Sequence, residues 1–277
     1  ERRLMPESYP LNVWPDKNVL PGFEDAAKEL GNLMKNVVAL LAVHIDQFVN
    51  NSVMKTDFTI EKKWKLNMGK ELSETQKVKG RILYYFPSDS EHSNNDIDET
   101  KTNEADNVAS WIGWHNDSGF LTALAGDAYL DHQTGKFLSR DEIDPHAGLH
   151  VSDRSGTICQ VDIPDDCMGV QIGECFQIVT GGAVVATPHC VRGARPVNSR
   201  GEITDKRVAR ISFPCFVDTV PSFPLSVPPE GFGGNRESVL VESIENDRVP
   251  ALEERWLYDG MTFGDFLRNT FAMYYDW

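Results

Sequence analysis

Apolar residues in the first part of the chain recur at intervals of three and four from position 22 to position 49. This spacing predicts one long amphipathic helix, because such positions share a face of an α-helix. Pro21 precedes the pattern, and Glu24 and Asp25 lie in its first turn. These residue types are favoured at the start of a helix. The apolar positions are Phe23, Ala26, Ala27, Leu30, Leu33, Met34, Val37, Val38, Leu41, Ile45 and Phe48.

Beyond residue 80 the pattern changes to short runs of β-prone residues separated by Gly, Pro and Asp. The run 81–86 is aromatic and is closed by Pro87, which indicates a strand. Many short strands at close spacing are typical of a sandwich or a barrel. The further expected strands are 120–124, 149–151, 157–161, 169–172, 175–179, 183–187 and 208–216.

The remaining segments complete a single-domain organisation. Residues 88–106 are almost entirely Asp, Glu, Ser and Asn, which predicts a flexible acidic surface loop, and the Pro- and Gly-rich stretch 221–234 predicts irregular structure. Apolar positions predict a last helix from Thr262 to about Tyr275. No linker separates parts that could each bury a core, so we expect one domain over 1–277. It would comprise a helical support region 1–80, a β core 81–220 and a C-terminal part 221–277.

Composition narrows the class of protein. Hydrophobic residues make up 40% and charged residues 25%, as in ordinary soluble globular proteins. The formal net charge of −15 repels phosphate backbones and anionic membrane surfaces, so nucleic acid is not an expected partner. No stretch approaches the roughly 18 uncharged residues of a spanning helix, so we expect no membrane segment.

The five cysteines form no Cys-x-x-Cys pair and no dense framework, which indicates a reducing compartment and argues against a structural zinc site. We therefore expect a cytoplasmic protein. A targeting peptide removed during maturation would leave no trace in this chain, which begins with Glu1.

His115 and Asp117 are the first candidate chemical residues. In a strand-like segment, side chains two apart point to the same face, so this pair could hold one ion together. Taken alone, however, a His-x-Asp pair is more often simply part of a surface loop. His189 follows the expected strand 183–187 and could supply a third ligand. Two His and one carboxylate leave positions open on an octahedral ion, which suits non-haem Fe(II) and oxygen chemistry.

Arg210 and Ser212 form the second candidate pair, again two apart on an expected strand. An inward Arg on a mainly apolar strand is costly unless it meets an anion, and its guanidinium matches a carboxylate. The anion could belong to a ligand, or to one of the chain's many Asp and Glu residues in a structural salt bridge.

Taken in order, His-x-Asp, a distal His and Arg-x-Ser resemble the isopenicillin-N-synthase-like family of 2-oxoglutarate and Fe(II)-dependent oxygenases, which are built on a double-stranded β-helix, or jelly roll. The likeness covers about 10–275 and is strongest over 111–216. It extends to His-Asn-Asp-Ser-Gly-Phe-Leu-Thr-Ala-Leu at 115–124, Gly-Leu-His-Val at 148–151, the stretch 170–182 and the tyrosine-bearing run 81–87.

The resemblance implies a mainly β jelly-roll core with flanking helices, and a role for each candidate. His115, Asp117 and His189 would bind Fe(II), while Arg210 and Ser212 would bind the distal carboxylate of 2-oxoglutarate. Tyr85 would add a hydrogen bond to that carboxylate. The implied reaction uses molecular oxygen to hydroxylate or desaturate a substrate, with release of succinate and carbon dioxide.

The substrate itself is not identified, because the family pattern does not extend to the pocket mouth. We expect a small organic molecule, and a peptide or protein side chain is the alternative. Residues 126–147 look like an inserted hairpin, and such insertions reshape a pocket without touching its metal ligands. The aromatic residues Trp111, Trp114, Phe120 and Phe216 could line the pocket or pack in the β core.

Two other functions fit the same residues. One is an Fe(II) oxidase that does without 2-oxoglutarate, with Arg210 and Ser212 holding the substrate's own carboxylate. The other is a non-catalytic jelly roll that binds a metal or ligand, with the acidic stretch 88–106 serving a partner. The sequence does not indicate an oligomeric state.

Overall fold

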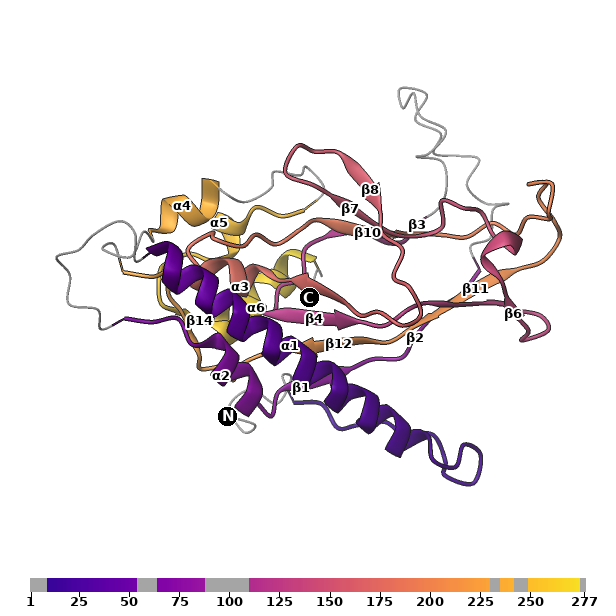
Figure 1. Ribbon diagram of the computed structural model, residues 1–277, viewed down its shortest axis with the longest axis horizontal. Helices are drawn as coiled ribbons and strands as arrows, with labels where there is room; N and C mark the ends of the chain where they lie inside the picture. The colour runs from indigo at the N-terminus through magenta and orange to yellow at the C-terminus, as the bar shows by residue number, and fades with distance from the viewer. Residues whose placement is uncertain (1–8, 54–63, 88–109, 230–234, 242–248, 275–277) are drawn as a thin grey trace.

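The computed structural model describes residues 9–53, 64–87, 110–229, 235–241 and 249–274 (Figure 1). The stretch 88–106, expected as an acidic loop, lies outside these residues, as does the start of the chain. The strands are β1 (Val78–Gly80), β2 (Leu83–Tyr85), β3 (Ser110–His115), β4 (Leu121–Leu124), β5 (Ala128–Asp131), β6 (Phe137–Leu138), β7 (Gly148–Ser152), β8 (Ile158–Gln160), β9 (Gly169–Ile172), β10 (His189–Arg192), β11 (Val208–Ser212), β12 (Pro214–Val217), β13 (Pro224–Leu225) and β14 (Met261–Thr262). The helices are α1 (Phe23–Val53), α2 (Met68–Glu74), α3 (Glu174–Val179), α4 (Arg236–Val241), α5 (Leu252–Arg255), α6 (Phe263–Tyr274) and the 3-10 helix η3 (Arg140–Glu142).

Antiparallel strands form two layers. The sheets β1-β12-β4-β9 and β2-β11-β5-β6 are continuous with each other at three points. There β1 leads into β2, β4 into β5 and β11 into β12 across short breaks. They are therefore two halves of one long bent layer. The sheet β3-β10-β7-β8 forms the facing layer (Figure 1). This arrangement confirms the predicted jelly roll with a long N-terminal helix.

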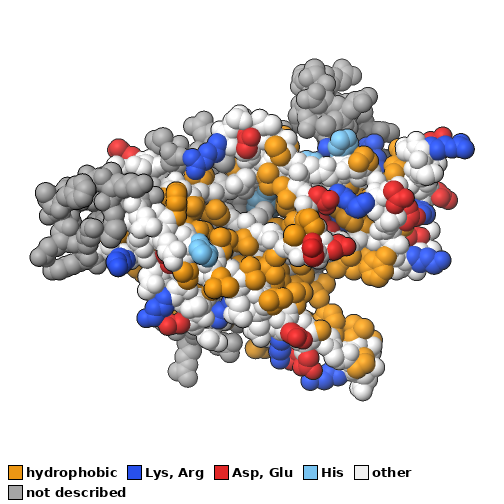
Figure 2. Space-filling model, viewed as in Figure 1, with side chains coloured by type: hydrophobic (Ala, Val, Ile, Leu, Met, Phe, Trp, Pro, Cys, Tyr) orange, Lys and Arg blue, Asp and Glu red, His pale blue; other side chains and the backbone are white. Residues whose placement is uncertain are grey.

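The long helix α1 covers the outer side of the bent layer, where it contacts β1, β4 and β12 (Figure 1). It buries Met34, Val38, Ala42, Ile45 and Val49, which follow the predicted spacing of three and four. Its outer surface keeps exposed apolar residues such as Leu33, Leu40 and Phe48. Hydrophobic side chains accordingly gather across the middle of the face seen in Figure 2.

Two of the predicted strands are wrong. Residues 175–179 form part of helix α3, and all six side chains of α3 are buried. A short apolar run buried on every side has no periodicity that separates helix from strand. Residues 183–187 form no strand, because the amide of Ala186 donates to the side-chain oxygen of Gln177 rather than to a neighbouring strand. The strand here is β10, which begins at His189.

Other predicted elements are confirmed with shifted ends. The run 81–86 is a strand only over β2, and the run 208–216 is broken at Phe213 into β11 and β12. Residues 126–147 do form a hairpin, in which β5 pairs with β6 and η3 follows. The last helix is α6, while the pattern missed α2, α4 and α5.

The main hydrophobic core lies between the β4–β12 half of the bent layer and the helices. It includes Leu121, Cys215 and Val217 from the strands, Phe176 from α3 and Phe266 from α6. A second, smaller cluster of Tyr129, Ile143, Ala147 and Val208 supports the other half. None of the described helices combines the length and apolarity needed to cross a bilayer.

Candidate metal centre and carboxylate pocket

His115, Asp117 and His189 come together where β3 ends and β10 begins. The two strands are paired so that His189 lies opposite His115, and Asp117 follows in the loop after β3. One donor atom from each of the three side chains lies within 4.8 Å of the others, and Nε2 of His189 is 3.9 Å from Oδ1 of Asp117. Asp117 is therefore brought in by the loop and not by the strand alternation that the sequence suggested.

Backbone carbonyls orient both imidazole rings. Nδ1 of His115 is 2.9 Å from the carbonyl oxygen of Gly113, and Nδ1 of His189 is 3.1 Å from that of Thr187. A carbonyl only accepts hydrogen bonds, so each Nδ1 carries the proton and each Nε2 keeps its lone pair. This arrangement leaves Nε2 of each ring available to a cation.

The Asp117 carboxylate is held from one side. The hydroxyl of Thr122 donates to its Oδ2 at 2.6 Å, which leaves Oδ1 on the side of His189. The side chains of Asp117 and His189 are only 10% and 6% exposed. Burial lowers the pKa of His189, which favours the neutral ring that a metal requires.

The start of α3 fixes the loop that carries Asp117. The amide of Glu174 donates to the carbonyl of Asp117 at 2.8 Å, and the amide of Gly173 donates to that of Phe120 at 2.9 Å. A Cβ on Gly173 would collide with the carbonyl of Gly119, so the two backbones approach more closely than a side chain permits. Gly173 and Glu174, which lie in the stretch 170–182, therefore hold the loop 117–120 through backbone contacts.

A buried ion pair extends this support to the C-terminal helices. The Glu174 carboxylate binds Arg255 through two hydrogen bonds, and the side chains are 2% and 1% exposed. Glu174 also accepts a hydrogen bond from the side-chain amide of Asn116, which lies between the two candidate ligands. The loop 115–120 is therefore tied to α5.

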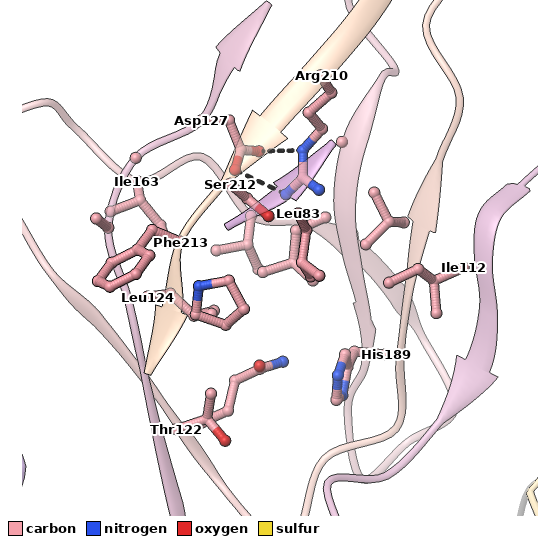
Figure 3. A pocket seen from close by; sticks show the side chains of 18 of the residues that line it. Leu83, Ile112, Thr122, Leu124, Asp127, Ile163, His189, Arg210, Ser212 and Phe213 are labelled. Atoms are coloured by element: carbon pink, nitrogen blue, oxygen red, sulfur yellow. Dashed lines mark hydrogen bonds and ion pairs between the residues drawn. The ribbon is translucent and has the colours of Figure 1, made fainter. Parts of the chain in front are cut away.

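Arg210 and Ser212 lie in β11 on the same face, as predicted, and both are buried. Arg210 forms a bidentate ion pair with Asp127, with Nε–Oδ2 at 2.8 Å and Nη2–Oδ1 at 2.7 Å (Figure 3). Tyr85 lies opposite Arg210 in the register of β2 and β11, and its ring centroid is 4.7 Å from the guanidinium carbon. The salt bridge considered from the sequence is thus present, and Asp127 is its acid.

A single cavity of about 370 Å³ joins the two groups. All six predicted residues, His115, Asp117, His189, Arg210, Ser212 and Tyr85, line it, and their roles there stay predictions. Figure 3 shows His189 toward one end and the Arg210–Asp127 pair at the other. Much of the wall between them is apolar, including Leu83, Ile112, Leu124, Ile163 and Phe213.

Several polar residues of this cavity were not indicated by the sequence pattern, among them Asp127, Arg140 and Gln171. Asp127 opens the predicted hairpin 126–147 and lies two positions before Tyr129, at the spacing that places side chains on one strand face, but no local pattern connects it to Arg210. Of the four aromatic residues considered, Phe216 lines the cavity. Phe120 packs against Phe223 and Phe263 in the main core instead.

Comparisons with solved structures come from proteins of low sequence identity. A 2OG-Fe(II) oxygenase family protein from Caulobacter crescentus matches with a TM-score of 0.55 at 19% identity, over 95% of this chain and 62% of that chain. A full-length Neurospora crassa protein in complex with alpha-KG matches with a TM-score of 0.53 at 16% identity, over 95% and 62% of the two chains. The same Neurospora protein with alpha-KG and 5-formyluracil matches with a TM-score of 0.54 at 15% identity, over 93% and 63%.

No protein-family model matches the chain, and neither does any curated protein. The chain spans about three-fifths of the length of the matched structures. At these identities the likeness shows the fold alone, a jelly roll that this chain shares with the matched proteins.

Proposed function

We propose that this protein is a non-haem Fe(II)- and 2-oxoglutarate-dependent dioxygenase that hydroxylates or desaturates a small organic molecule, releasing succinate and carbon dioxide. The observation that carries the proposal is the joint presence in one cavity of a His-Asp-His cluster and a buried Arg-Ser pair. The fold shared with the Neurospora crassa protein, which is described in complex with alpha-KG, supports it.

The donor set fits Fe(II). Two neutral imidazoles and one carboxylate on one side of an ion are the ligands of non-haem Fe(II) oxygenases. His115 and His189 present Nε2, and Asp117 presents Oδ1. When bound, the iron would supply activation of molecular oxygen for attack on an unreactive C–H bond.

The chain's own residues would position the reactants. Arg210 and Ser212, which are buried in β11, would hold the distal carboxylate of 2-oxoglutarate, and Tyr85, whose ring lies against the guanidinium of Arg210, would add a hydrogen bond to that carboxylate. The apolar side chains of Leu83, Ile112 and Phe213 would exclude water from the space beside the metal. Binding and orientation are thus the protein's part of the reaction.

Partners and location complete the proposal. A cavity of this size fits a small organic substrate, and the net charge of −15 makes nucleic acid an unfavourable partner. All five cysteines are free, and Cys159 and Cys167 are exposed, which accords with a cytoplasmic protein.

The deciding experiment is an anaerobic titration of the Fe(II)-loaded protein with 2-oxoglutarate, following the visible metal-to-ligand charge-transfer absorption. We expect an absorption band in the wild type, a lost or much weaker band in Arg210→Ala, and an unchanged band in Arg200→Ala. Arg200 is a matched control because it lies on an exposed turn.

Absence of the band in the iron-loaded wild type would reject 2-oxoglutarate as cosubstrate. Oxygen uptake without succinate would then indicate the Fe(II) oxidase, and no oxygen uptake with any substrate tested would indicate the non-catalytic binding protein.

A further inference from the structure

Arg210 already has one carboxylate partner within the chain. Asp127 accepts hydrogen bonds from Nε and Nη2 of Arg210 at 2.8 Å and 2.7 Å, and both residues line the cavity (Figure 3). Such a side-on pair occupies one edge of the planar guanidinium and fixes its plane.

Strand pairing places Asp127 at this point. Ala128 of β5 lies opposite Ile211 of β11, so Asp127 comes next to Ser212 as the two strands continue. Tyr129, two residues on, lies opposite Arg210. Because strand side chains alternate, Asp127, Tyr129, Arg210 and Ser212 share the face that looks into the cavity.

One nitrogen of Arg210 is left over. Nε and Nη2 donate to Asp127, and the ring of Tyr85 lies 4.7 Å from the guanidinium carbon. Arg210 is only 5% exposed, and its Nη1 is buried and has no hydrogen-bond partner among the described residues. An unpaired buried donor is costly, so the cavity is built to receive one more acceptor at Nη1.

We propose that Asp127 is a positioning residue, which turns the guanidinium of Arg210 so that its Nη1–Nη2 edge, together with Ser212, meets the distal carboxylate of the ligand end-on. This inference rests on the function proposed above. Arg210 then serves two carboxylates at once, one from the hairpin and one from the ligand. Without Asp127 the long Arg side chain is free to rotate, and the ligand must restrict it on binding.

The test measures selectivity for the distal carboxylate. The Mn(II)-loaded protein is titrated calorimetrically with 2-oxoglutarate and with 2-oxopentanoate, which has the same carbon chain but no distal carboxylate. The selectivity ratio is the dissociation constant of 2-oxopentanoate divided by that of 2-oxoglutarate. It reports only the interaction at the Arg210 end, because both ligands share the group that meets the metal.

The expected pattern is graded. Asp127→Asn keeps one acceptor, and we expect its selectivity ratio to fall about tenfold, the equivalent of one charge-assisted hydrogen bond. The selectivity ratio should fall further in Asp127→Ala. It should also fall in Asp127→Glu, because the carboxylate is displaced while its charge remains. Binding of 2-oxopentanoate should not change in any of them. Asp205→Asn, which changes an exposed carboxylate outside the cavity, is the control and should keep the wild-type ratio.

Three outcomes overturn the inference. An unchanged ratio in all Asp127 variants would make the pair purely structural, and so would equal weakening of both ligands. A higher ratio in Asp127→Asn would mean that the Asp127 charge opposes the ligand carboxylate more than its hydrogen bonds orient Arg210. The proposed function fails separately, if the wild-type protein does not prefer 2-oxoglutarate over 2-oxopentanoate.

Discussion

Thr122 offers a sharp test of the proposed metal centre, because its hydroxyl holds one oxygen of the Asp117 carboxylate. The Oγ1–Oδ2 distance is 2.6 Å and Thr122 is 3% exposed, so there is little space for water to replace the bond in Thr122→Val. Valine has nearly the same shape, so the cavity walls stay in place. A hydrogen bond to a charged group contributes roughly 1.5–3 kcal/mol, and the carboxylate in the variant is no longer held toward the metal.

We therefore expect the Mn(II) dissociation constant of Thr122→Val to rise by about 10- to 100-fold, which is the usual effect of removing a group that orients a metal ligand. The assay is competition with a chelator of known affinity, with unfolding by denaturant measured in parallel. Thr219→Val is the matched control, because the buried hydroxyl of Thr219 has no hydrogen-bond partner among the described residues. Unchanged metal affinity in a folded Thr122→Val, or an equal loss in Thr219→Val, would refute the reasoning.

Three further predictions concern the surroundings of the site. Gly173→Ala should displace the loop carrying Asp117, because its Cβ meets backbone, and should weaken Mn(II) binding in the same competition assay; wild-type affinity would contradict the close approach. Arg255→Met should lower the free energy of unfolding by about 3–5 kcal/mol, because Glu174 is left buried without its ion-pair partner. Adding Glu174→Gln should recover part of this stability. A denaturant titration in which Arg255→Met is as stable as the wild type would show that the pair is dispensable. Hydrogen bonds from Lys206 and from Ser139 lower the pKa of Glu142 from 4.5 to about 2, so this carboxylate stabilises the fold above pH 4.5 and the effect is lost as the pH falls toward 2. The difference in Tm between wild type and Glu142→Gln should shrink over that interval, and a constant difference would exclude ionisation of Glu142 as its cause.

The sequence predicted those parts of the structure in which local pattern and burial agree. The spacing in α1 placed the helix because one face of it is buried and the other is not. The pairs His115–Asp117 and Arg210–Ser212 could be found because each lies within three residues of chain, so their proximity does not depend on the fold.

The errors arose where tertiary contacts override local preference. Residues 175–179 are β-prone, yet they form a helix whose preceding Gly173 packs against the loop 117–120, which no local rule contains. The partner of Arg210 could not be chosen among the many acidic residues, because Asp127 is 83 positions away and only the pairing of β5 with β11 brings it near.

The division of the interior into two clusters separates stability from specificity. The large core, with Leu121, Phe176 and Val217, lies on the helix-covered side and does not depend on the hairpin. The hairpin rests mainly on the small cluster around Tyr129 and Ile143. Substitutions in the hairpin can therefore change what the cavity admits without altering the residues of the main core, so the hairpin is the natural place to diversify sequence when a different ligand is wanted.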